Sequence, residues 1–198
     1  RVWQVVPTAQ RPLAPAWLVG TLVHAALALW RFPGAGFDAW VTARAREYGQ
    51  TDTQQLEHAR AATARLLARL RQHPRFGDMA RAERRLHEVP YSYVRSGQVE
   101  TGYVDLLYRV DGAWRLVDFK TDRVADEAAL RRILAQTDYR AQVQGYGTAV
   151  RRLLGVEARL ELCWLDYGGE VRFTALFPPL SPLPKGGEIG SPPPLGED

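Results

Sequence analysis

The chain has little cysteine and no long hydrophobic run, and each of these two shortages excludes a class of protein. Cys163 is the only cysteine among 198 residues, which rules out an intrachain disulfide and any zinc or iron–sulfur site built from four cysteines. The longest apolar run, residues 25–30, is far shorter than the roughly 18 residues that a membrane-spanning helix needs. Residues 1–4 show no start of a secretory signal. We therefore expect a cytoplasmic protein with no membrane partner.

The residues that are present are typical of one globular domain. Apolar residues make up 46% of the chain and charged residues 24%. A net charge of +4 permits a nucleic-acid partner without requiring one. Of the 26 basic residues only Lys120 and Lys185 are lysines. Because lysine is a compact ammonium whose pKa can shift, while arginine stays charged and planar, we expect Lys120 to do something that arginine cannot.

The first part of the chain is predicted to be helical. Residues 1–15 carry three prolines and no periodicity, so we expect an extended lead-in. Apolar residues at helical spacing predict three helices, over residues 17–30, 37–48 and 52–72. Asp52 and Gln55 resemble a capping box at the start of the third helix, and Pro74 is expected to end it. Since residue 1 is not methionine, we expect a piece of a longer protein.

The character of the sequence changes after Arg85. Runs rich in β-forming residues predict five strands, over residues 87–94, 99–110, 114–121, 160–165 and 171–177. A helical stretch over 126–154, broken near Thr137, separates the third strand from the fourth. Seven of the 13 prolines lie from residue 178 onward, so we expect residues 178–198 to form a disordered tail without a catalytic role.

Two aspartates and one lysine form the central chemical signal. Asp105 and Asp118 lie on successive predicted strands, each among apolar residues, and Lys120 follows two residues after Asp118. Burying two ionised carboxylates together is costly unless a cation holds them, and Mg²⁺ prefers oxygen ligands. An Asp at a strand end is often only a turn residue, and Asp–Lys two residues apart is often a surface ion pair. Together the three residues favour a metal site with a lysine beside it.

At this point the sequence resembles a known family. A strand with Gly-x-x-Asp, then Asp-Phe-Lys-Thr, then a helix with Gln-x-x-x-Tyr is the pattern of the PD-(D/E)xK nuclease superfamily. It is most similar to the RecB/AddA-type nuclease domains of helicase–nucleases. The matching segments are residues 20–24, 88–91, 102–105, 118–121 and 139–146. The resemblance implies an α/β, restriction-endonuclease-like domain over residues 16–177, with a mixed twisted sheet of about five strands, flanking helices and a helical N-terminal part.

The resemblance also implies a role for each matching residue. Asp105 and Asp118 would bind a divalent metal, Mg²⁺ or Mn²⁺, with the main-chain carbonyl of Phe119 as a further ligand. His24, which alone on an apolar helix face is more often a core histidine, would complete the metal shell. Lys120 would act on the attacking water or on the phosphate.

Three further residues take a place beside these ligands. Gln142 and Tyr146, four residues apart on one helix face, would orient the site and contact the DNA backbone. Glu88 matches a position that we interpret as mainly structural. Relatives that carry an iron–sulfur cluster use four cysteines, so no such cluster is expected here.

The sequence thus predicts metal-dependent hydrolysis of DNA phosphodiesters, as the exonuclease domain of a helicase–nuclease in double-strand-break repair. One alternative is a non-catalytic module that binds DNA ends or acts as a scaffold; another is a free-standing, restriction-like endonuclease. No Walker A pattern occurs, so a helicase domain or partner subunit would lie outside this chain. Eight arginines between Arg60 and Arg85 are either a track for DNA phosphates or a solvated helix face.

Overall fold

The computed structural model describes residues 13–95 and 97–176, so the predicted tail and most of the predicted lead-in lie outside the described residues. Four helices form the N-terminal part: α1 (Ala16–Ala28), α2 (Phe37–Glu47), α3 (Thr53–Gln72) and α4 (Pro74–Ala80). The three predicted helices are confirmed, and Asp52 caps α3 by accepting a hydrogen bond from the Gln55 N–H at 2.8 Å. In the described ranges, every helix is too short or too polar to span a membrane.

The helix α4 was not predicted from the sequence. Pro74 ends α3, as expected, but it also occupies the first turn of α4, where its missing N–H is not needed. The ring nitrogen Nδ1 of His73 accepts a hydrogen bond from the Arg75 N–H at 3.1 Å and caps the new helix. Proline is therefore both the end of one helix and the start of the next.

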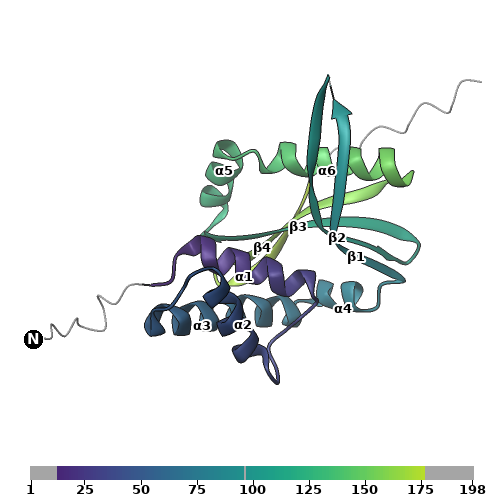
Figure 1. Ribbon diagram of the computed structural model, residues 1–198. Helices are drawn as coiled ribbons and strands as arrows, with labels where there is room; N and C mark the ends of the chain where they lie inside the picture. The colour runs from purple at the N-terminus through teal and green to yellow at the C-terminus, as the bar shows by residue number, and fades with distance from the viewer. Residues whose placement is uncertain (1–12, 96, 177–198) are drawn as a thin grey trace, which may run out of the picture.

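The C-terminal part is a five-stranded sheet in the order β1-β2-β3-β4-β5 (Figure 1). The strands are β1 (Arg84–Arg95), β2 (Gln98–Val110), β3 (Ala113–Val124), β4 (Ala158–Tyr167) and β5 (Glu170–Ala175). The pair β3–β4 is parallel and the other neighbours are antiparallel. The helices α5 (Glu127–Gln136) and α6 (Tyr139–Leu154) connect the two parallel strands, and the break near Thr137 is confirmed.

Helices cover both faces of this sheet, and each face has its own core. Side chains of α1–α4 pack on one face of the central strands, against residues that include Tyr108, Phe119 and Cys163. Side chains of α5 and α6 pack on the other face, against residues that include Leu116, Leu162 and Trp164. The α/β fold, with a mixed five-stranded sheet between helices, is therefore as predicted.

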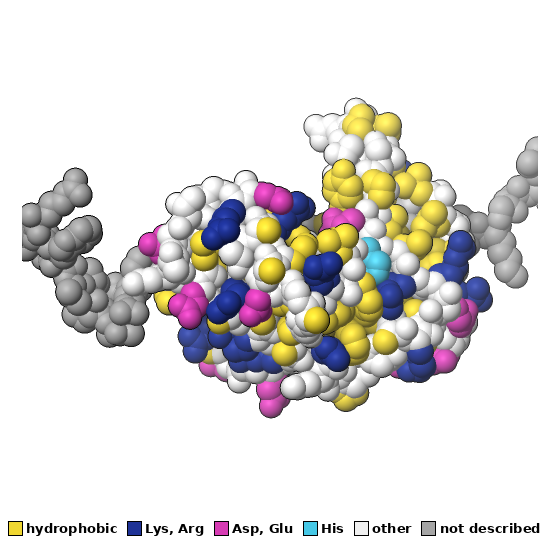
Figure 2. All heavy atoms as spheres, turned by 60° about the horizontal axis from the view of Figure 1, so that its bottom comes forward, with side chains coloured by type: hydrophobic (Ala, Val, Ile, Leu, Met, Phe, Trp, Pro, Cys, Tyr) yellow, Lys and Arg dark blue, Asp and Glu magenta, His cyan; other side chains and the backbone are white. Residues whose placement is uncertain are grey.

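Strand β2 separates from β3 at the centre of the sheet. Their pairing runs from Val110/Ala113 to Leu106/Val117 and goes no further. Beyond that point β2 stays paired with β1 alone, and the two strands project from the sheet as a long hairpin (Figure 1). Exposed apolar side chains lie on this hairpin, among them Val94, Val99 and Tyr103 (Figure 2). The separation of β2 and β3 leaves space for polar side chains between them.

Candidate active site

Asp105 occupies the place where β2 leaves β3. Its Oδ2 accepts a hydrogen bond from the backbone N–H of Phe119 at 2.8 Å. The Asp105 carboxylate thus satisfies a β3 donor at the point where the β2 backbone no longer pairs with β3. Its other oxygen, Oδ1, lies 3.3 Å from Nδ1 of His24 on α1. The structure thus places His24 beside a predicted carboxylate, which it approaches from the first helix.

Asp118 and Lys120 lie on the same side of β3, as alternation along a strand requires. The carboxylate of Asp118 is 3% exposed, and its Oδ2 lies 2.7 Å from Nζ of Lys120. Lys120 also donates a hydrogen bond to Oε1 of Gln142 at 3.0 Å, and its ammonium lies 3.9 Å from the centre of the Tyr139 ring. The buried carboxylate of Asp118 therefore lies beside an ammonium group that also contacts Gln142 and Tyr139.

The two predicted residues of α6 extend this arrangement. The amide nitrogen Nε2 of Gln142 donates a hydrogen bond to the hydroxyl oxygen of Tyr146 at 2.6 Å. Tyr146 packs edge-on against Tyr91 of β1, with ring centroids 5.5 Å apart. Burial and the nearby charges of Asp118 and Asp105 raise the pKa of Tyr146, so this hydroxyl stays protonated. A chain of contacts thus runs from Asp118 through Lys120 and Gln142 to Tyr146.

Glu88 belongs to this site, although we interpreted it from the sequence as mainly structural. Glu88 offers one ligand atom, as do His24 and Asp105, and these three atoms lie within 4.8 Å of one another. A group with this spacing can hold a metal ion. Glu88 has φ of 46°, a strained conformation for a residue of this size, which is typical of functional positions. The pairing of Val89 with Val104 could have indicated this position, because it brings residue 88 next to residue 105.

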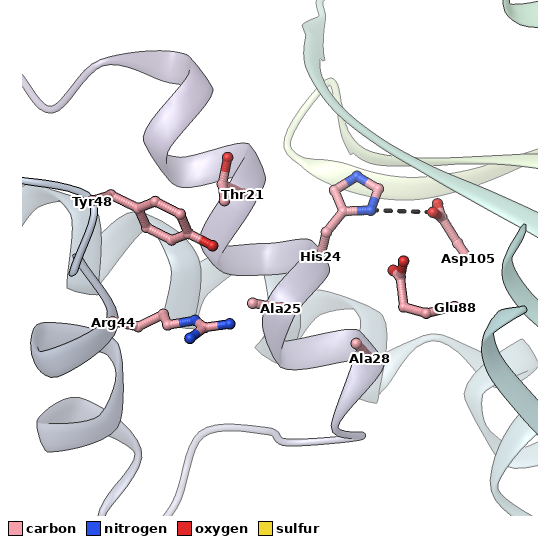
Figure 3. Close-up of a pocket in the computed structure, with 8 residues that line it drawn as sticks. All are labelled: Thr21, His24, Ala25, Ala28, Arg44, Tyr48, Glu88 and Asp105. Carbon is pink, nitrogen blue, oxygen red and sulfur yellow. Dashed lines mark ion pairs between the residues drawn. The ribbon is translucent and has the colours of Figure 1, made fainter. Parts of the chain in front are cut away.

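A pocket of about 500 Å³ opens beside these groups, with its walls on α1, α2 and the two strands of the hairpin. Figure 3 shows His24, Glu88 and Asp105 pointing toward one another at one end, and Arg44 and Tyr48 at the other. Small side chains of α1 line the pocket between the two ends: Thr21, Ala25 and Ala28. Because these side chains are small, the surface between the acidic group and Arg44 stays open.

The electrostatics of the site show how the carboxylates affect one another. Burial and the charge of Asp105 together raise the pKa of Asp118 to about 6, although Lys120 and His24 oppose the rise. Burial and the charge of Asp105 also raise the pKa of Glu88. Burial lowers the pKa of His24, but the hydrogen bond and charge of Asp105, with Asp118 and Glu88, outweigh it and leave the pKa raised. The cluster therefore carries more negative charge than its own cations offset.

These observations fit a divalent cation. Oδ2 of Asp118 is buried and, within the described residues, has the Lys120 ammonium beside it but no hydrogen bond of normal geometry. The donors that surround the gap are carboxylate oxygens and one imidazole, which suit a hard divalent ion. The group at metal-ligand spacing in the described residues contains Asp105, His24 and Glu88 but not Asp118. Asp118 is linked to it by the charges of Asp105 and His24, which shift its pKa. A ligand role for the carbonyl of Phe119 stays a prediction.

The sequence as a whole places the chain in a family. Residues 2–174 match the model of the PD-(D/E)XK nuclease superfamily, so the chain belongs to that superfamily and has the fold of a nuclease. No protein with curated annotation shows significant similarity to it.

A solved structure supports the same fold. The chain resembles a crystal structure described as a candidate exonuclease from Eubacterium rectale, with a TM-score of 0.51 and 15% identity, over 88% of this chain and 61% of that one. The chain thus spans about three fifths of that protein, and at this identity the likeness shows the fold alone. A match to protein VC1899 from Vibrio cholerae has a TM-score of 0.26 and 12% identity, over 62% of this chain and 43% of that one, and supports no conclusion.

Proposed function

We propose that this chain is a Mg²⁺-dependent deoxyribonuclease, most similar in role to the exonuclease domain of a RecB/AddA-type helicase–nuclease. The observation that carries the proposal is the position of Asp118, which is buried beside the ammonium of Lys120, next to the point where β2 leaves β3, and near enough to Asp105 for that charge to raise its pKa. A buried acidic group with a raised pKa, next to a lysine, is an arrangement that occurs at catalytic sites. The superfamily supplies the class of reaction.

Each residue of the site would have its own role in phosphodiester hydrolysis. When bound, the metal would activate water and offset the charge that develops on the phosphate. Asp105, Asp118, His24 and Glu88 would hold it. Lys120 would stabilise the developing phosphate charge or orient the attacking water from the Asp118 side.

Two residues fix the lysine that acts in this step. Gln142 accepts a hydrogen bond from the Lys120 ammonium at 3.0 Å, and Tyr146 receives one from Gln142 at 2.6 Å. These contacts limit the directions in which Lys120 can point. Tyr146 also keeps its proton near neutral pH, so it can donate to a DNA backbone oxygen.

The pocket beside α1 supports a polynucleotide substrate. It places Arg44 and the ring of Tyr48 opposite the acidic cluster, and arginine and aromatic rings are the usual contacts for phosphates and bases. The sequence pattern shared with RecB/AddA-type domains supports the helicase–nuclease context, with the motor in another domain or subunit.

The test is to incubate the purified chain with linear and circular DNA, single- and double-stranded, in Mg²⁺, Mn²⁺ or EDTA. We expect linear DNA to be degraded and circular DNA to survive, with no cleavage in EDTA. Cutting of circular double-stranded DNA would instead indicate a restriction-like endonuclease. Binding without cleavage in either metal would indicate a non-catalytic module that binds DNA ends.

A further inference from the structure

The structure separates the arginine-rich segment, residues 60–85, into two groups. Most of these side chains are held by neighbouring protein groups. Arg60 pairs with Asp38, Arg71 donates to the Pro33 carbonyl, Arg75 pairs with Glu161, Arg81 pairs with Asp78, and Arg85 donates to the Met79 carbonyl and lies over the Trp30 ring. The other three are Arg84, which is exposed on β1, and Arg65 and Arg69, which lie four residues apart on α3 and line a pocket.

This pocket lies at the carboxyl ends of the two parallel strands and has a volume of about 530 Å³. Arg123 near the end of β3 joins Arg65 and Arg69 in its wall, and the turn between β4 and β5 forms another part of it. Gly168 of that turn donates a hydrogen bond to the Val124 carbonyl at 2.7 Å, which fixes the turn against β3. Since glycines carry no side chains, the turn at residues 168–169 leaves the arginines accessible.

The charge of this pocket is not neutralised by its own residues. Asp166 is the acidic residue of its lining, and its Oδ1 lies 2.7 Å from Nη1 of Arg69. In the described ranges, no carboxylate oxygen lies within ion-pairing distance of Arg65 or Arg123, and both residues are exposed. Two guanidinium groups therefore face the pocket without an acidic partner, which is the composition of a phosphate-binding site rather than of a structural ion pair.

The pocket is linked to the catalytic centre by a single strand. Arg123 follows Lys120 by three residues on β3, with an irregularity of register between them, so the two positions are at most about 10 Å apart. A nucleic-acid strand advances about 3.4 Å per nucleotide in the B form, so the pocket lies at most about three nucleotides from the site. Helix α1 packs closely on β3 between Lys120 and Arg123. At Gly20 the approach is so close that an added Cβ atom would lie 3.1 Å from Oγ1 of Thr121.

We propose that Arg65, Arg69 and Arg123 form a second phosphate-binding subsite, which holds the backbone of a DNA strand whose scissile phosphate lies at Asp118. The inference rests on the proposed function, because it states where the DNA substrate of that function would lie on the protein surface. It also selects, among the eight arginines of the segment, the two that contact nucleic acid. Arg69 is positioned by Asp166, whereas Arg65 and Arg123 supply the free charge.

The test is a binding measurement on the full chain in EDTA, where binding does not depend on cleavage. The probes are fluorescent single-stranded oligonucleotides of about 4 to about 16 nucleotides, the range of common single-strand site sizes. The variant is R65Q/R123Q, and the control is R84Q/R109Q, which removes the same charge from paired positions of β1 and β2 at the opposite end of the sheet. All four arginines are exposed, so both variants should keep the wild-type fold, which circular dichroism will check.

For wild type and for R84Q/R109Q, we expect affinity to rise once the oligonucleotide is long enough to reach the pocket. For R65Q/R123Q we expect this rise to disappear, with affinity for long oligonucleotides about tenfold weaker and affinity for the shortest unchanged. The slope of log Kd against log salt should fall by about 0.7 for each phosphate that the variant no longer neutralises. An equal weakening of binding in both double variants, or none in R65Q/R123Q, would overturn the subsite.

Two further outcomes separate this inference from the proposed function. Length-dependent binding through Arg65 and Arg123 in a chain that cleaves no DNA would support the subsite and reject the nuclease. Cleavage with unchanged binding in R65Q/R123Q would support the nuclease and reject the subsite. If a mononucleotide competes as strongly as a long oligonucleotide, the pocket binds free nucleotides and the proposed path is wrong.

Discussion

The ammonium of Lys120 lies 2.7 Å from Oδ2 of Asp118, two residues earlier on the same strand. Both side chains are nearly enclosed, at 11% and 3% exposure, so the pair differs from the surface ion pair that Asp-x-Lys often represents. The pair alone does not neutralise the site, because the pKa of Asp118 is still raised to about 6. The excess negative charge near this pair is what a divalent cation would offset.

Replacing Asp118 is expected to abolish cleavage while leaving the chain folded. Asp118→Asn keeps the shape of the side chain but removes the charge that would hold the metal. We expect no DNA degradation in Mg²⁺ above background, with a circular dichroism spectrum like that of wild type. Wild-type rates in this variant would contradict the mechanism.

The same variant predicts a pH dependence of stability in EDTA. The pKa of Asp118 is about 6 in the folded chain and 3.8 as the reference value, so the folded state binds this proton more tightly. Protonation of Asp118 therefore adds to the free energy of unfolding, on the order of 3 kcal/mol. This contribution is fully present below pH 4 and is lost as the pH rises through 6. At pH 8, Asp118→Asn should therefore resist urea better than wild type, and at pH 4 the two should converge. A constant difference across this range would contradict the prediction.

Replacing Lys120 by arginine is expected not to restore function. The ammonium fits between the Asp118 carboxylate, the Gln142 amide oxygen at 3.0 Å and the Tyr139 ring at 3.9 Å. A guanidinium is larger and planar, and a displacement of about 1 Å at a catalytic group can cost about 100-fold in rate. We expect single-turnover cleavage by Lys120→Arg to be as slow as that by Lys120→Ala. A near-native rate for the arginine variant would mean that Lys120 supplies charge alone.

Glu88 is expected to contribute to metal affinity. Its carboxylate can lie with the other groups of the cluster at metal-ligand spacing, so Glu88→Gln should weaken Mn²⁺ binding about tenfold or more, measured by calorimetry in the absence of DNA. Glu57→Gln on the exposed surface of α3 is the matched control and should bind as wild type does. Equal affinity in both variants would return Glu88 to a structural role.

The open surface of α1 between the acidic cluster and Arg44 can be tested by filling it. Ala25→Phe adds a ring to the wall of the pocket without changing a predicted ligand. We expect cleavage to fall by about tenfold or more, because the substrate path is narrowed, while Mn²⁺ affinity stays unchanged. Ala61→Phe, at an exposed position of α3, controls for the substitution itself. Unchanged cleavage by Ala25→Phe would show that DNA does not cross this surface.

The sequence by itself determined the elements of the fold except α4, and most of the proposed site. The capping interaction of Asp52 and the break near Thr137 are local features, so local sequence predicts them. The approach of Asp105 to the strand that carries Asp118 could also be predicted, because a short hairpin between two strands brings fixed positions together. His24 needed the family resemblance, since nothing in its own helix indicates a partner far along the chain.

Only the tertiary structure decided which groups surround Glu88 and the arginines. Glu88 itself has a positive φ in β1 and lies in one cluster with His24 and Asp105, and the sequence around it gives no sign of that conformation. The arginines of residues 60–85 have the same side chain, yet Arg75 pairs with a buried glutamate while Arg65 faces an open pocket. That difference depends on which distant carboxylates the packing of α3 and α4 on the sheet places nearby, and such long-range neighbours are fixed only when the chain has folded.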